Sequence, residues 1–406
     1  MAGRRFLELF VIGPLRDLHR PPKGQLAALD FLRSCAILGV LAFHFSRSAY
    51  LPLGGSENFF SQLPLVSYGR IGVDLFFVLS GYFIGKQLWR ELCRTGTIDL
   101  SRFVLRRGLR IWPLYYAVWT FVVLQRQRTT GVPLDGWWAN IFFLSNYFPQ
   151  FDIVSGSWSL SVEEQFYLTA PLLLLGGAFL RMPVRWFRWL LIGLLGLLPL
   201  VRMVVHVRAD GLVMGMLLAH LDVVDGSRFK QGLFASGWPL LISFLVFVPC
   251  FHSPILMETG CALFFGACTW FFVARRWPRL AMLESHSFYV ISRLSFGMYL
   301  NHFYLLSVTA AFTLHYVPAD WGAAVQQMAG TLLFIGASAG VAVVTFCLIE
   351  WPFLRLREWM FTNQVESFPG RGHLSHSSQT NSITKTRKNE NTKKGNRRTK
   401  RDLLGC

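Results

Sequence analysis

Two ionisable side chains, Arg33 and His44, lie on one apolar stretch near the start of the sequence. The stretch, residues 29–45, is otherwise apolar enough to be a membrane-spanning helix. The two lie eleven positions apart, close to three helical turns, so both project from one face about 16 Å apart. An ionisable residue inside a membrane helix is costly and commonly marks a functional site. The spacing predicts a cation near one membrane surface and an imidazole well towards the other.

Histidine is suited to general acid–base chemistry near neutral pH, so His44 is a candidate general base. Structural explanations remain open for both residues. A lone membrane histidine is often a packing residue that bonds a backbone carbonyl, and Arg33 could form an ion pair with Asp30 near the helix start. Other polar groups facing the same pair would favour the functional explanation.

Two carboxylates begin later apolar stretches, at the end of the helices where His44 is expected. Asp74 begins the second apolar stretch, and Glu163 begins the fourth. Ser159, Glu163 and Tyr167 repeat at i, i+4 and i+8 and therefore share a helix face. A carboxylate near His44 could fix its tautomer and raise its basicity. The alternative is that these acids only stabilise the helix starts through the helix dipole.

Arginines form a regular stripe before the third apolar stretch. Arg102, Arg106 and Arg110 repeat every four residues, which places them on one helix face at the expected cytoplasmic surface. Guanidinium groups suit phosphate oxygens, so the stripe predicts a site for a cytosolic polyphosphorylated ligand. The rule that cytoplasmic loops are positive explains part of the pattern without a ligand. A further histidine, His302, lies in the middle of a late apolar stretch.

The composition is that of a polytopic membrane protein. Hydrophobic residues make up 53% of the 406 residues and aromatic residues 15%, and the mean hydropathy is +0.40. Apolar runs long enough to cross about 30 Å of hydrocarbon recur along most of the sequence. The runs are continuous and lack the alternation of a β-barrel strand. The expected fold class is therefore all-α, a polytopic transmembrane helical bundle.

The net charge of +18 does not indicate a nucleic-acid partner, because of where the charge lies. Lysine and arginine gather in short loops between apolar runs and in the C-terminal tail, as the positive-inside rule requires. The seven cysteines contain no CxxC pair, so neither a disulfide nor a zinc site is expected. No bound metal or cofactor is expected.

We expect about ten spans, with both termini in the cytoplasm. This topology treats residues 136–148, which are too short and too polar for a span, as re-entrant or interfacial. The chain then divides into a cytoplasmic amphipathic segment (1–24), a transmembrane domain (25–358) and a basic, disordered cytoplasmic tail (359–406). The ten predicted spans are 26–46, 72–88, 104–124, 158–180, 187–205, 209–221, 233–251, 259–274, 294–314 and 325–349.

Several motifs, in order along residues 25–358, resemble the acyltransferase-3 family of membrane-bound acyltransferases. No single motif is fully specific, and the resemblance rests on their order. The motifs are Leu29-Asp30 followed by Arg33 and His44, Gly72-Val-Asp-Leu-Phe-Phe-Val-Leu-Ser-Gly81, the arginine run into Ile111-Trp-Pro-Leu-Tyr115, Trp158-Ser-Leu-Ser-Val-Glu-Glu-Gln-Phe-Tyr167, Tyr299-Leu-Asn-His302 and Glu350-Trp-Pro352.

The resemblance implies an integral membrane enzyme that takes an acyl group, usually acetyl from cytosolic acetyl-CoA, and places it on a sugar hydroxyl. Acceptors in the family include surface polysaccharides, lipopolysaccharide and glycolipids. The family's Arg/Lys-X10-His pair maps onto Arg33 and His44, and its acidic helix start maps onto Glu163. The expected partners are acetyl-CoA, a carbohydrate or glycolipid acceptor and the lipid bilayer, and the expected location is the plasma (inner) membrane.

These observations give each candidate residue a predicted role. The catalytic residues are His44, as general base, and Asp74 or Glu163, as the group that orients its imidazole. The acyl-CoA-binding residues are Arg33, Arg102, Arg106 and Arg110. The residues expected to line the site are Asp30, Ser159, Tyr167 and His302. The rival interpretation is a transporter or flippase, in which the same charged residues line the path of a glycan or anionic metabolite.

Overall fold

The structure is a computed structural model, and it describes residues 11–21, 26–48, 58–131, 135–205, 207–226, 236–274 and 285–366. Every regular element in these ranges is helical, which confirms the all-α fold class for the described residues. The longer helices are α3 (Ala27–Ser46), α6 (Gly72–Thr95), α7 (Leu100–Thr130), α9 (Trp158–Phe179), α10 (Phe187–Arg202), α11 (Asp210–Val223), α12 (Trp238–Phe251), α13 (Met257–Ala274), α14 (His286–Tyr316), α15 (Ala323–Thr345) and α16 (Trp351–Glu366).

Short helices complete the described chain. A π-helical turn, Phe346–Glu350, joins α15 to α16. The remaining short elements are α2 (Gly13–Leu18), α4 (Phe59–Gln62), α5 (Pro64–Ser67), η2 (Gly69–Ile71), α8 (Trp137–Ile141), η3 (Pro149–Phe151), η4 (Val184–Trp186) and η7 (Ala319–Trp321). Helix α8 has five residues and is followed by turns, which agrees with leaving 136–148 out of the spans.

Each of the ten predicted spans overlaps a helix, although residues 233–235 of the span 233–251 lie outside the described residues. Five helical stretches in the described ranges are long and apolar enough to cross a membrane. The other predicted spans are shorter, as in the 14-residue α11 and α12, or carry several polar side chains, as in α7, α9 and α14. The number of spans and the side of each terminus therefore stay predictions. The five apolar stretches are Ala27–Ser46, Gly69–Thr95, Val184–Arg202, Met257–Ala274 and Ala323–Phe361.

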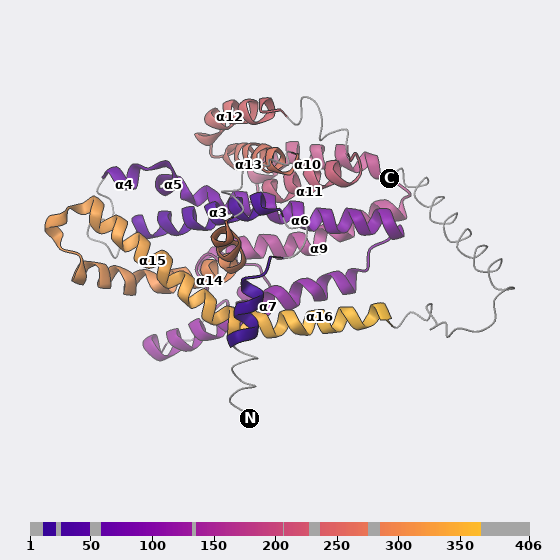
Figure 1. Ribbon diagram of the computed structural model, residues 1–406. Helices are drawn as coiled ribbons and strands as arrows, with labels where there is room; N and C mark the ends of the chain where they lie inside the picture. The colour runs from indigo at the N-terminus through magenta and orange to yellow at the C-terminus, as the bar shows by residue number, and fades with distance from the viewer. Residues whose placement is uncertain are drawn as a thin grey trace.

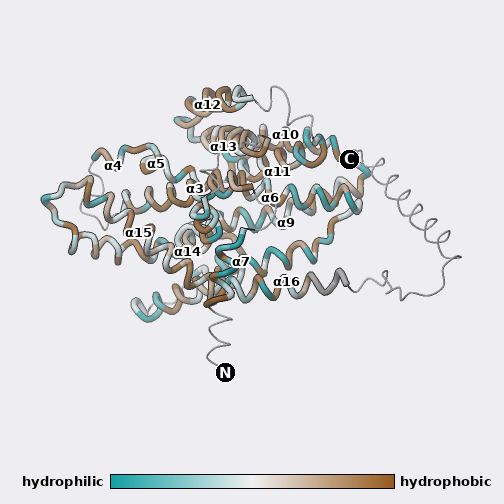
Figure 2. Tube along the Cα trace, in the orientation of Figure 1, coloured by the Kyte–Doolittle hydropathy of each residue, from teal (hydrophilic) through white to brown (hydrophobic). Residues whose placement is uncertain are grey.

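The outer helices present apolar side chains away from the protein. No residue of α12 is buried, although its sequence, WPLLISFLVFVPCF, is almost wholly apolar. Figure 2 shows α10, α12, α13 and α15 as mostly hydrophobic, whereas hydrophilic residues are frequent along α7. Apolar surface on this scale is unsuited to water and suited to lipid. The protein is therefore an integral membrane protein.

Helix α6 lies at the centre of the bundle, where it contacts α3, α9, α11 and α13 (Figure 1). Helices α14 and α15 form a hairpin against α3, and α16 packs beside α7. Neighbouring helices approach α6 closely at two of its glycines. A Cβ on Gly72 would lie 2.5 Å from the backbone oxygen of Ala36 on α3, and one on Gly81 would lie 2.2 Å from that of Leu212 on α11.

The close contact between α6 and α11 gives a first testable prediction. Because the atom that opposes Gly81 belongs to the backbone, Gly81→Ala must push the two helices apart, and overpacking of this kind costs about 1–3 kcal/mol. Gly193→Ala on α10 is the matched control, since no atom lies within 4 Å of its Cβ position. We expect a lower thermal unfolding midpoint in detergent for Gly81→Ala only. Equal midpoints would contradict the tight packing of α6 on α11.

The predicted domain boundaries are not tested by the fold. Helix α16 continues through the predicted boundary at 358/359 and ends at Glu366. The rest of the predicted tail lies outside the described residues. Of the predicted N-terminal segment, α2 is described, and its Leu18 is buried in a cluster with residues of α3, α14 and α15.

Candidate active site

Two cavities lie one after the other inside the bundle. The larger, which we call the cationic cavity, has a volume of about 600 Å³ and is lined by residues of α3, α6, α7, α9 and α14. This volume falls within the roughly 300–1,000 Å³ typical of small-molecule sites. The smaller, which we call the His44 cavity, measures about 260 Å³ and lies where α3 ends and where α6, α9 and α13 begin.

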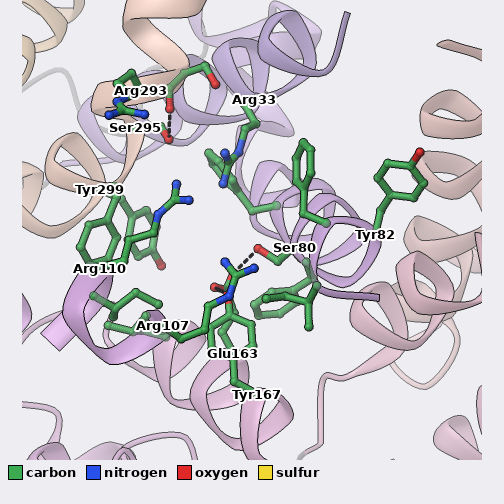
Figure 3. A pocket seen from close by; sticks show the side chains of 18 of the residues that line it. Arg33, Ser80, Tyr82, Arg107, Arg110, Glu163, Tyr167, Arg293, Ser295 and Tyr299 are labelled. Atoms are coloured by element: carbon green, nitrogen blue, oxygen red, sulfur yellow. Dashed lines mark hydrogen bonds between the residues drawn. The ribbon is translucent and has the colours of Figure 1, made fainter. Parts of the chain in front are cut away.

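The walls of the cationic cavity carry a large excess of positive charge. Six cationic side chains and two carboxylates line it. In Figure 3, Arg33, Arg107 and Arg110 point into the same space from α3 and α7. A cavity with this balance favours a multiply charged anion. The cationic residues are Arg33, Lys86, Arg90, Arg107, Arg110 and Arg293, and the acidic residues are Asp30 and Glu163.

Arg33 lies where an anionic ligand could reach it. Its guanidinium carbon lies 5.4 Å from the centre of the Phe83 ring, and its Nε has no hydrogen-bond partner in the described part of the protein. Arg293, from the start of α14, also has an Nε without a partner there. Buried polar groups are normally hydrogen-bonded, so these two atoms are candidates for contact with a bound ligand.

Glu163 lies in the cationic cavity, and it does not line the His44 cavity. Its carboxylate accepts hydrogen bonds from the Ser80 hydroxyl at 3.1 Å and from the Tyr167 hydroxyl at 2.7 Å. Figure 3 shows the bond to Ser80 as a dashed line. The predicted role of Glu163 in orienting His44 stays a prediction, and Tyr167 and Ser159 line the same cavity as this carboxylate.

Asp74 does share a cavity with His44, but its carboxylate is paired with another residue. Arg208 donates to both carboxylate oxygens of Asp74, at 3.0 and 3.1 Å. The Arg208 guanidinium lies 4.8 Å from the Trp158 ring centre and 3.5 Å from a carboxylate oxygen of Glu258. Asp74 is therefore held at the wall of the His44 cavity by a residue two positions before the start of α11.

The aromatic neighbours of His44 include His302, whose ring centre lies 5.1 Å away, and Phe303, at 4.7 Å. His302 is fully buried, and its Nδ1 faces the backbone carbonyl of Tyr299. A carbonyl only accepts, so Nδ1 carries the proton and Nε2 is left as an acceptor. This Nε2 has no partner within the described residues. His302 thus places a hydrogen-bond acceptor close to His44.

The arginine stripe divides between two places. Arg110 lines the cationic cavity, whereas Arg102 and Arg106 lie 5.6 and 5.3 Å from the ring centre of Phe361 on α16. A repeat of four residues turns by about 40° at each step, so Arg102 and Arg110 face directions about 80° apart. Arg107 lines the cavity together with Arg110, which lies three positions further along the helix. The predicted role of Arg102 and Arg106 in binding acyl-CoA stays a prediction.

Arg107, Arg208 and Tyr299 are among the lining residues of the two cavities that were not predicted as site residues from the sequence. Arg107 has the same spacing signal as its neighbours, because i and i+3 share a helix face as well as i and i+4. Arg208 stands next to a helix start, but nothing local indicates that Asp74 is its partner. Tyr299 belongs to a quoted motif, and it lines both cavities.

No cluster of three or more histidine, cysteine, aspartate or glutamate side chains that could hold a metal is present in the described ranges. The expectation that no disulfide forms is wrong for Cys93, which is disulfide-bonded. The free cysteines of the described chain are Cys35, Cys250, Cys261, Cys268 and Cys347.

Residues 26–350 match the family model of the acyltransferase-3 family, which describes an acyltransferase domain, so the chain belongs to this family. The chain is 27% identical to the peptidoglycan O-acetyltransferase OatA of Listeria monocytogenes over 410 residues, which cover 89% of this chain and 60% of that protein. It is 35% identical to the O-acetyltransferase OatA of Staphylococcus aureus over 164 residues, 37% of this chain and 24% of that protein. The chain thus spans less than two thirds of these relatives. No solved structure matches it.

Proposed function

We propose that this protein is a membrane-bound O-acyltransferase, which transfers an acetyl group from acetyl-CoA to a hydroxyl of a carbohydrate acceptor. The observation that carries the proposal is the succession of a strongly cationic cavity and a cavity lined by His44. Membership of the acyltransferase-3 family and similarity to proteins named O-acetyltransferase support it. A surface polysaccharide such as peptidoglycan is the acceptor class that the names of these relatives favour.

The donor binds through its phosphates in the cationic cavity. Arg33, Arg107 and Arg110 project into one space, and guanidinium forks match phosphate oxygens. Lys86 and Arg90, in the C-terminal half of α6, also line this cavity, and Lys86 forms an ion pair with Asp222. The pantetheine arm then extends between the helices towards His44. Arg102 and Arg106 lie on the neighbouring face of α7, where their charge attracts the nucleotide as it approaches.

The acceptor hydroxyl enters the His44 cavity, where His44 acts as general base. As the hydroxyl oxygen attacks the thioester carbonyl, its proton moves to the imidazole. The carbon–sulfur bond breaks, and the departing thiolate takes that proton, which returns His44 to its neutral form. Asp74 or Glu163 is the group proposed from the sequence to orient the ring. The His302 ring centre lies 5.1 Å from that of His44. Asp30 lines the donor side of this path.

We further propose the topology of about ten spans in the plasma membrane, with both termini cytoplasmic. The ends of α6 and α14 that carry Lys86, Arg90 and Arg293 then face the cytosol, where acetyl-CoA is made. The segment at 1–24 and the basic tail at 359–406 lie on the same side. The tail's lysines and arginines suit contact with anionic headgroups.

Purified protein in liposomes, supplied with acetyl-CoA labelled in the acetyl group and with muropeptide or oligosaccharide acceptors, tests the proposal. We expect stoichiometric release of free CoA thiol and labelled acetyl ester on the glycan, detected by mass spectrometry. Empty liposomes are the control. A transporter or flippase would instead move the glycan or the label across the bilayer with no release of thiol. That result would show that the protein is a transporter or flippase and would contradict the proposed enzyme activity.

A further inference from the structure

Two residues line both cavities, Val73 on α6 and Tyr299 on α14. No other residue in the described ranges is common to the two linings. Val73 is buried, and the phenol ring of Tyr299 is the larger of the two groups at this boundary. The junction between the cationic cavity and the His44 cavity is therefore formed by one isopropyl group and one aromatic ring.

The Tyr299 side chain is anchored at its far end to a different part of the protein. Its hydroxyl donates a hydrogen bond to the backbone carbonyl of Gly156, at 3.0 Å, and lies 2.7 Å from the Ser159 hydroxyl. Both partners belong to the start of α9 and the turn before it. The ring thus reaches from α14 to α9 across the junction, and it cannot swing aside without breaking both hydrogen bonds.

The anchor at Gly156 depends on a backbone conformation that favours glycine. Gly156 has a φ of +83°, and a Cβ there would lie 2.8 Å from Cε2 of Phe303. Phe303 itself lines the His44 cavity. The Gly156 carbonyl that accepts the hydrogen bond from Tyr299 is therefore held in place by packing against the wall of the His44 cavity. The fold thus fixes the position of the Tyr299 ring.

We infer that Tyr299 determines the size of the acyl group that can reach His44, an inference that rests on the proposed function. A donor held by its phosphates in the cationic cavity must pass its acyl group between Tyr299 and Val73 to meet an acceptor beside His44. A two-carbon acetyl group is narrow enough to pass an anchored ring. Each further methylene of a longer acyl chain has to occupy space that the ring fills. Tyr299 therefore selects short acyl thioesters.

The test compares kcat/KM for acetyl-CoA, butyryl-CoA and hexanoyl-CoA in the liposome assay, with thiol release and ester formation as readouts. Tyr299→Ala is expected to raise the butyryl-to-acetyl ratio at least about 10-fold, because one methylene in a tight site changes discrimination by about 10–200-fold. Tyr299→Phe keeps the ring and loses the anchor, so its ratio should rise less. Tyr289→Ala is the matched control, since Tyr289 on the same helix lines the cationic cavity and not the junction.

The outcomes separate the inference from the proposed function. An active wild-type protein and a folded Tyr299→Ala variant with the same butyryl-to-acetyl ratio would overturn the role of Tyr299 and leave the proposed function standing. An equal rise of the ratio in Tyr289→Ala would also overturn it, because the effect would then not belong to the junction. A wild-type protein that releases no CoA thiol would reject the proposed function itself. If Tyr299→Ala does not fold, Tyr299→Leu replaces it with the same expected direction.

Discussion

Replacing His44 with alanine is expected to lower kcat for acetyl transfer by about 10²–10⁴-fold, the usual contribution of a positioned general base. The acceptor hydroxyl would then lose the imidazole that lines its cavity, since His302 lines neither cavity. Because the phosphates of the donor bind in the cationic cavity, which His44 does not line, KM for acetyl-CoA should change little. The measurement is steady-state thiol release with acceptor present, together with acetyl-CoA titration.

His315→Ala provides the matched control for this prediction. His315 lies near the C-terminal end of α14, is exposed, and lines neither cavity. We expect its kcat and KM to equal those of the wild type. Normal acetyl transfer by His44→Ala would remove His44 from the mechanism. A loss confined to KM would make His44 a residue that binds the donor, and that too would contradict its assignment as the base.

The helices could be predicted from the sequence because the bilayer leaves few alternatives. A chain inside hydrocarbon must satisfy its backbone hydrogen bonds within itself, so each long apolar run has to be a helix. The ends of the helices were less predictable. Helix α7 begins at Leu100 and ends at Thr130, several residues beyond the predicted 104–124 on each side, because its polar ends continue the helix outside the apolar run.

The site could be predicted from the sequence only where a single helix fixes the relative positions of its residues. Arg33 and His44 are placed relative to each other by a single helix, and the structure puts one at each of the two cavities. The partners of the carboxylates come from distant parts of the chain. Asp74 meets Arg208 because α11 packs closely on α6, and no spacing in the sequence encodes that contact.

The rotation of α9 about its own axis explains the remaining difference between the predicted site and the observed one. Glu163 lies in the second turn of α9, close to the start that the sequence indicates, and its carboxylate faces Ser80 and the cationic cavity. The direction that a helix face takes is set by its neighbours, in this case by contacts with α6 and α7. A periodic pattern shows which residues share a face and leaves open what that face meets.

The second large effect is expected at the arginines of α7. Arg107→Gln/Arg110→Gln removes two cations from the cationic cavity, and a hydrogen bond to a charged group contributes about 1.5–3 kcal/mol. Each lost contact with phosphate should therefore weaken CoA binding by about 10–100-fold, since 1.4 kcal/mol corresponds to a factor of ten. Isothermal titration of CoA into the protein in nanodiscs measures the change directly.

Arg102→Gln/Arg106→Gln is the matched control, because it removes the same charge from the same helix on the side that faces Phe361. We expect a smaller loss of affinity for CoA, because these two arginines attract the nucleotide only through solvent. This loss should disappear as the salt concentration is raised. The loss at Arg107 and Arg110 should persist in salt, since direct phosphate contacts in a cavity are screened less. A larger loss at Arg102 and Arg106 would mean that the nucleotide lies along the surface between α7 and α16, and the cationic cavity would then hold only the pantetheine arm.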